Sequence, residues 1–124
     1  MEDKKPLNIE EILRRMEEGL GEEPRPMVLM SKILPGWIPR QAGERKFLME
    51  DLQHIPPKYK HLIMIAAAAA VGSHLCTETF IKIAQRSGVS AKEIGEALLT
   101  ARFALASTVF ATAIEGMESL VPGS

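Results

Sequence analysis

The sequence has one cysteine, few aromatic residues and no surplus of positive charge. A single cysteine among 124 residues excludes an internal disulfide, a Cys-x-x-Cys redox pair and a cysteine-only metal site within one chain. Lysine and arginine total 15 against 16 aspartates and glutamates, a formal net charge of -1, so the composition does not favour nucleic-acid binding. Aromatic residues make up 5% of the chain and hydrophobic residues 46%, so we expect an aliphatic, alanine-rich core.

Long apolar runs and a targeting signal are also lacking. The N-terminal Met-Glu-Asp-Lys-Lys-Pro has no apolar core of a signal peptide. The longest apolar run, residues 62–72, is shorter than the roughly 20 residues that span a bilayer. We therefore expect a soluble cytoplasmic protein with a reduced thiol and no membrane partner. The length predicts one domain over residues 1–124, in which residues 1–26 form an N-terminal helix and linker.

Helix signals are numerous, and no segment shows the sustained alternation of a strand. Caps, apolar stripes and breakers predict about six helices, which lie between Asn8 and Leu20, Met27 and Leu34, Pro39 and Ile55, Pro57 and Val71, Ser73 and Gly88, and Ala91 and Leu120. The clearest boundary is Ser90, which has Glu93 as its capping-box partner. Residues 62–65 cover every face of their helix, so we expect that helix to be buried centrally or against another subunit.

The last predicted helix has two apolar faces. The first seam is Ile94, Leu98, Ala101 and Leu105, and the second is Leu99, Phe103, Phe110, Ile114 and Met117. Two such faces exceed what a small monomer buries, which favours a dimer or a higher oligomer. The alternative is a break near residues 104–107, with both pieces packed inside one chain.

Cys76 is the strongest candidate for chemistry. If Ser73 caps the helix, Cys76 occupies its third position, close to unpaired N–H groups and the positive end of the helix dipole, which favour a thiolate. The alternative is a small buried side chain without a chemical role.

Two histidines are candidate proton partners for Cys76. His61 lies near the start of the alanine-rich helix, and its distance from Cys76 depends on the bend at Gly72. His74 precedes Cys76 by two residues and Glu78 by four, a spacing that also suits a surface ion-pair ladder. The two histidines and Cys76 lack a recognisable ligand spacing, so we expect neither a metal nor a cofactor.

Three segments resemble the carboxymuconolactone decarboxylase and alkyl hydroperoxidase D family. They are residues 57–63 (Pro-Lys-Tyr-Lys-His-Leu-Ile), residues 72–76 (Gly-Ser-His-Leu-Cys) and residues 84–97 (Ala-Gln-Arg-Ser-Gly-Val-Ser-Ala-Lys-Glu-Ile-Gly-Glu-Ala). The turn into a helix at residues 88–97 is the most specific of the three. The resemblance implies an all-α, multi-helix bundle of the alkyl hydroperoxidase D-like type that assembles as a trimer or a hexamer.

The peroxidase members of this family carry a glutamate, about a dozen residues, and then Cys-x-x-Cys-x-x-x-His. The resemblance places the second cysteine on Cys76, the first on Ser73 and the histidine on Phe80, and it places the glutamate on or beside His61. One of four functional positions is retained, so a dithiol–disulfide cycle within one subunit is excluded.

Three functions follow as hypotheses. The first is a peroxidase-related antioxidant oxidoreductase, in which Cys76 is oxidised to a sulfenic acid and restored by an external thiol, with His61 or His74 as the proton partner. The second is a decarboxylase-type enzyme without thiol chemistry that uses His61 as its acid or base. The third is a non-catalytic oligomeric scaffold that has lost the redox motif.

Overall fold

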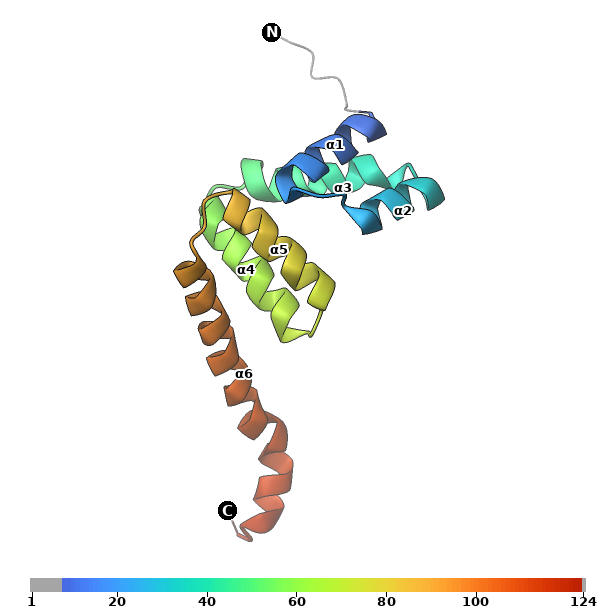
Figure 1. The fold of residues 1–124 in the computed structure, drawn as a ribbon. Helices are drawn as coiled ribbons and strands as arrows, with labels where there is room; N and C mark the ends of the chain where they lie inside the picture. Colours follow the sequence, from blue (N-terminus) through green and yellow to red (C-terminus); the bar gives the residue numbers. More distant parts are fainter. Residues whose placement is uncertain (1–7, 124) are drawn as a thin grey trace.

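The described part of the protein is built from six α-helices and one short π-helical turn (Figure 1). The computed structural model describes residues 8–123, and no strand occurs among them. The elements are α1 (Ile9–Leu20), α2 (Arg25–Ile33), α3 (Trp37–Lys46), η1 (Phe47–Asp51), α4 (Pro57–Ala70), α5 (His74–Arg86) and α6 (Ala91–Leu120). This architecture confirms the predicted all-α class and the number of helices.

The predicted caps are present at three helix starts. The Asn8 side chain accepts a hydrogen bond from the Glu11 amide at 2.8 Å. At the start of α6, the Glu93 amide donates to Ser90 Oγ at 3.1 Å and the Ser90 amide donates to the Glu93 carboxylate at 2.9 Å, which completes the capping box. These bonds hold the pKa of Glu93 at about 2, the Ser90 amide contributing most and Lys58 next.

Prolines predicted the starts of helices less accurately than the capping side chains did. The second helix begins at Arg25 rather than Met27, and the third begins at Trp37 rather than Pro39. A proline is tolerated throughout the first turn, where its missing N–H would have no partner in the helix, so it locates a start only to within a turn. The third helix also ends sooner than predicted, because η1 follows it and the Leu52 amide bonds to the Phe47 carbonyl at 3.1 Å.

The core lies where α4, α5 and α6 meet. Ile65 of α4 and Ala84 of α5 are fully buried there beside Val89 and Ile94. The helices α4 and α5 form an antiparallel hairpin, and the Lys58–Glu93 ion pair (2.9 Å) joins the starts of α4 and α6 (Figure 1). The first half of α6 therefore runs alongside α4 in the same direction.

The N-terminal helices cover one end of this hairpin. The helix α1 packs on both α5 and α3, and α2 packs on α3 (Figure 1). Two long-range contacts join α5 to the end of α1 and the segment after it. The Arg86 guanidinium donates to the Glu18 carbonyl at 2.7 Å, and Lys82 pairs with Glu22, just beyond α1, at 2.6 Å. Both contacts use the last turns of α5.

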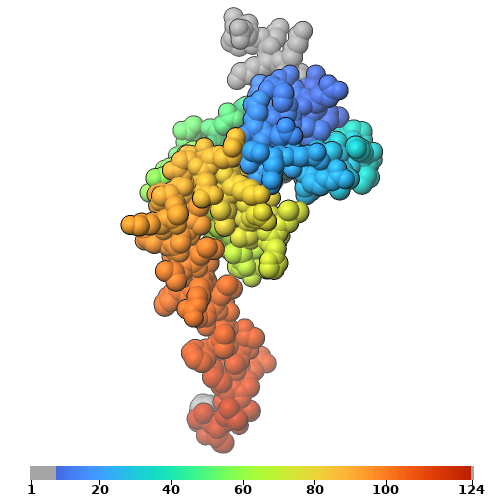
Figure 2. Space-filling view, in the orientation of Figure 1, coloured from blue at the N-terminus to red at the C-terminus, as the bar shows by residue number. Residues whose placement is uncertain are grey.

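The helix α6 is continuous over 30 residues, so the break near residues 104–107 does not occur. Ile94 and Leu98 of its first seam pack into the core. Its C-terminal half extends beyond the other helices, and the space-filling view shows it projecting from the body (Figure 2). The helix α4 was predicted to be buried either centrally or against another subunit. Central burial on all sides is wrong, because Ile63 is 54% exposed in the single chain.

By length and composition, α6 could cross a membrane. An 18-residue window within it has a mean hydropathy of 1.6, and none of that window is buried. The expectation of no membrane-spanning segment considered only the uninterrupted run at residues 62–72, whereas the apolar residues of α6 are interspersed with Ser and Thr.

Candidate functional site

Cys76 lies in the first turn of α5 and is exposed to solvent as a free thiol. Ser73 caps the helix as predicted: its Oγ accepts a hydrogen bond from the Cys76 amide at 3.4 Å. The alternative of a small buried side chain is wrong in the single chain, because the residue is exposed. The thiol is therefore accessible to a reagent, at the end of the helix where the dipole is positive.

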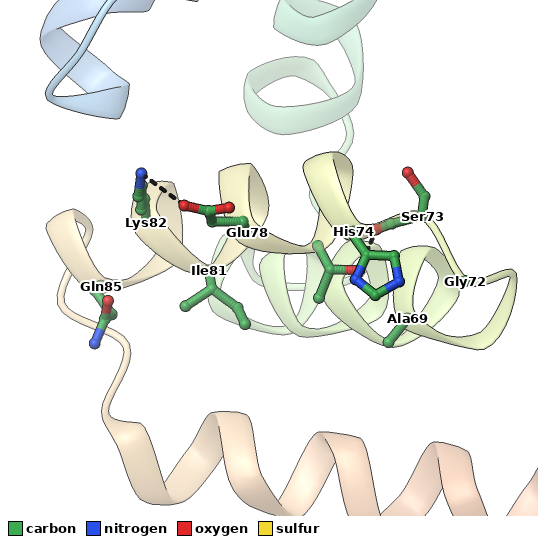
Figure 3. Close-up of a pocket in the computed structure, with 9 residues that line it drawn as sticks. Ala69, Gly72, Ser73, His74, Glu78, Ile81, Lys82 and Gln85 are labelled. Atoms are coloured by element: carbon green, nitrogen blue, oxygen red, sulfur yellow. Dashed lines mark hydrogen bonds and ion pairs between the residues drawn. The ribbon is translucent and has the colours of Figure 1, made fainter.

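An open groove runs along the neighbouring face of α5 (Figure 3). Its volume is about 610 Å³, and it is lined by Ala69, Gly72, Ser73, His74, Thr77, Glu78, Ile81, Lys82 and Gln85. Glu78 and Lys82 form an ion pair at 3.1 Å along this face. His74 is exposed in this groove, and it forms no ion pair with Glu78 in the described part of the chain. The groove contains charged and apolar side chains but not Cys76.

His61 lies in α4 and is buried, with only 7% of its surface exposed. Burial is the main reason that the pKa of His61 is lowered, and the positive charge of Arg45 lowers it further. Among residues 8–123 no hydrogen bond joins the imidazole to another side chain or carbonyl. His61 is therefore favoured as a neutral side chain inside the fold.

The fold separates His61 from Cys76. His61 precedes the last residue of α4 by nine positions, which is about 13 Å along a helix. Cys76 lies two positions after the first residue of the antiparallel helix α5, which places it only about 3 Å from the same end of the hairpin. The remaining offset of about 10 Å is far beyond hydrogen-bond distance, so the two side chains form no relay within one chain.

The two substituted motif positions have structural roles. Ser73 is the N-cap of α5, and its carbonyl also accepts the Thr77 hydroxyl at 2.7 Å. Phe80 packs against the hydrophobic core next to Ile65 and Ala84. Where the resemblance implies a thiol and a proton relay, this chain has a helix cap and a core side chain.

Sequence reasoning missed the neighbours of His61. Arg45 is half-buried and lies close enough to His61 to affect its pKa. Lys60 is 7% exposed, and its ammonium donates to the carbonyls of Leu48 and Leu52. No local pattern indicates these contacts, because each joins segments that lie far apart along the chain.

The lowered pKa of His61 predicts a loss of stability in mild acid. Below pH 6.5 the imidazole in the unfolded chain binds a proton that the folded protein resists, so the free energy of unfolding falls as the pH falls from 7.5 to 5.5. Urea unfolding at one protein concentration measures this. In His61→Gln the decrease should be smaller than in the parent, whereas His54→Gln, at an exposed position, should retain it. Equal decreases in the parent and His61→Gln would contradict the assignment.

A metal site is not evident among the described residues. Within residues 8–123, no three His, Cys, Asp or Glu side chains come together in a way that could hold an ion. The candidate chemistry therefore rests on Cys76. His74 is close to it in sequence, whereas His61 lies near the start of α4, at the other end of the hairpin.

The chain matches the sequence model of a known protein family. The model of the carboxymuconolactone decarboxylase family matches residues 43–118, which is more than half of the chain. The matched range includes all of α4 and α5 and nearly all of α6, and it leaves α1 and α2 outside. A search of curated proteins found no match.

Proposed function

Because the chain belongs to the carboxymuconolactone decarboxylase family, we propose that it is a homo-oligomeric thiol oxidoreductase of this family that uses the single cysteine Cys76. The supporting observation is the exposed thiol in the capped first turn of α5. The first turn of a helix is a favourable place for an anion, and a thiolate is the reactive form of cysteine.

The proposed reaction reduces a hydroperoxide at the expense of an external thiol. The sulfur of Cys76 attacks the outer peroxide oxygen, so that an S–O bond forms, the O–O bond breaks and the alcohol leaves with a proton. An external thiol then forms a mixed disulfide with Cys76 and releases water. A second external thiol attacks that disulfide, which restores Cys76 and releases the oxidised reductant. The reductant must be external because the chain has one cysteine, and a cytoplasmic thiol pool would supply it.

Proton transfer in this proposal uses solvent. His61 is about 10 Å too far along the hairpin, and His74 lies two residues from Cys76, a spacing that places two helical side chains on different faces. The exposure of Cys76 gives water direct access to the sulfur. The proposal therefore needs neither histidine within one subunit.

We expect Cys76→Ser to abolish thiol-dependent peroxide reduction. The assay follows consumption of cumene hydroperoxide with dithiothreitol as the reductant, and dimedone labelling with mass spectrometry identifies the sulfenic acid on Cys76. Thr79→Ala, one turn further along α5, is the matched control and should keep the parent rate. Equal rates in Cys76→Ser and the parent, or no dimedone adduct on the parent, would reject thiol catalysis.

The second candidate is a non-catalytic oligomeric scaffold. It is favoured by one observation: among residues 8–123 no acid or base is hydrogen-bonded to the Cys76 thiol. It predicts a stable assembly that neither consumes peroxide nor forms the dimedone adduct. A decarboxylase-type activity with His61 as acid or base has less support, because His61 is buried and does not line the groove on α5.

A further inference from the structure

Positive charge is concentrated in α2 and α3. Residues 25–46 contain five lysines or arginines and one glutamate, a net charge of +4, although the whole chain has a net charge of -1. Lys32 and Arg40 are exposed, and neither forms an ion pair in the described part of the chain. Arg25 pairs with Glu23 at 3.2 Å at the surface, which is a weak type of contact. This part of the surface is therefore suited to an anionic partner.

Large apolar side chains are exposed in the same two helices and in the turn that joins them. They are Leu29 (44% exposed), Ile33 (67%), Leu34 (60%) and Trp37 (37%). No residue of α2 is buried, so this helix contributes none of the fully buried side chains of the core. Single exposed side chains of this kind are common, but four within nine residues indicate an interaction surface.

The cations and the apolar side chains share one face of α2. Arg25, Leu29 and Lys32 follow one another at intervals of four and three, and Ile33 comes four residues after Leu29. These four side chains are exposed, whereas residues 27–28 and 30–31 are half-buried. The outward face of α2 therefore combines positive charge with apolar surface, and α2 contains no acidic residue that would offset the charge.

The turn between α2 and α3 is short and convex. The Trp37 amide donates to the Leu34 carbonyl and the Ile38 amide donates to the Pro35 carbonyl, both at 3.1 Å. Ile38 is fully buried and anchors the turn to the rest of the fold. Figure 1 shows this turn at the outer edge of the molecule, away from α6. A convex edge with apolar side chains fits a flat, deformable surface such as a lipid bilayer better than it fits a preformed protein site.

Six exposed side chains form the surface that we name the α2–α3 corner: Leu29, Lys32, Ile33, Leu34, Trp37 and Arg40. We propose that the α2–α3 corner binds the surface of an anionic lipid bilayer. The apolar side chains enter the interfacial region, where tryptophan is particularly favourable, and the cations face the anionic headgroups. Binding of this kind needs no membrane-spanning segment, so the expectation of no membrane partner, which rested on the lack of such a segment, does not exclude it.

The exposed half of α6 is less suited to the same lipid surface. The only charged residues from 103 to 120 are Glu115 and Glu118, which anionic lipid would repel. The α2–α3 corner also lies outside residues 43–118, the range that the family model matches. The proposed binding is therefore a property of the N-terminal part of this chain, and it does not depend on the chemistry of Cys76.

The first test is flotation of the purified protein with lipid vesicles. We expect the parent to bind vesicles of phosphatidylcholine and phosphatidylglycerol, and to bind much less to phosphatidylcholine alone or at high salt. The double variant Lys32→Gln, Arg40→Gln should bind roughly 25-fold more weakly, at about fivefold for each cation. The matched control is Lys92→Gln, Arg102→Gln, which removes two exposed cations of α6 and should keep the parent affinity. No binding by the parent, or equal affinities of the two double variants, would overturn the proposal.

The second test uses Trp37, the single tryptophan of the chain, as a reporter of the corner. Vesicle binding should shift its fluorescence emission to shorter wavelength, and brominated phosphatidylcholine should quench it, because the ring leaves water for the interface. Leu34→Ser should weaken binding, whereas Leu120→Ser, at an exposed position at the end of α6, should not. Binding without the shift and the quenching, or equal affinities of the two serine variants, would overturn the proposal.

Two further measurements distinguish other occupants of the α2–α3 corner. Sedimentation velocity of Leu34→Ser without lipid should give the particle mass of the parent, because the corner is not a contact between copies in this proposal. A helical peptide of glutamate and leucine represents an acidic protein partner. A smaller particle mass for Leu34→Ser, or binding of this peptide by a parent that does not bind vesicles, would overturn the proposal.

Discussion

Ile65→Ala is expected to lower the free energy of unfolding by about 3 kcal/mol, the middle of the range for a fully buried large-to-small change. Ile65 is 0% exposed and lies in the only cluster that joins the described helices α4, α5 and α6, where it packs with Ala84 and Ile94. The cavity cannot close easily, because α5 and α6 on either side are fixed by their own caps. For a domain with a total stability of about 5–15 kcal/mol, this is a large share.

Thermal and urea unfolding at one protein concentration measure the effect of Ile65→Ala, since self-association would make the midpoint depend on concentration. We expect the melting temperature to fall by roughly 10 °C. Ile33→Ala is the matched control, because Ile33 is 67% exposed at the end of α2 and should lose little stability. A loss of less than about 1 kcal/mol for Ile65→Ala would contradict the placement of the core.

Local features of the sequence predicted the helices well. Ser73 and Ser90 marked the starts of α5 and α6 because a cap is made between a side chain and an amide three residues away. The two seams of α6 were also correctly separated, since a face of a helix is defined by spacing alone. The π-helical turn η1 was not predicted. The Lys60 ammonium that donates to the Leu52 carbonyl at its end comes from a different helix, and no local pattern indicates that contact.

The candidate site was predicted only in part, for the same physical reason. The position of Cys76 in a capped first turn follows from Ser73 and was confirmed. The separation of His61 from Cys76 depends on α4 and α5 forming an antiparallel hairpin, which the sequence around Gly72 left open. Arg45 was not expected beside His61, because contacts between segments leave no periodic trace in a single sequence.

Lys60→Met is expected to destabilise the protein by about 2 kcal/mol, although methionine has a similar length and is apolar. The Lys60 ammonium donates to the Leu48 carbonyl and, at 2.7 Å, to the Leu52 carbonyl. Leu48 lies within η1 and Leu52 caps it, in the last turn of the helical segment, where carbonyls are left unpaired and the dipole favours a positive charge. Methionine fills the space but donates no hydrogen bond, so the carbonyls lose their partner and the charge that stabilises them.

The two neighbouring lysines make this prediction specific. Lys58 is half-exposed and pairs with Glu93 at the surface, so Lys58→Met should change the stability little, as is usual for surface ion pairs. Hydrogen exchange locates the effect, because the Leu52 amide closes the last turn of η1 and should exchange faster in Lys60→Met than in the parent. Equal stabilities for the two variants, or unchanged exchange at Leu52, would show that the lysine does not hold η1. The expected result ties the turn before α4 to a buried charge, which explains why Lys60 is buried near the start of that helix.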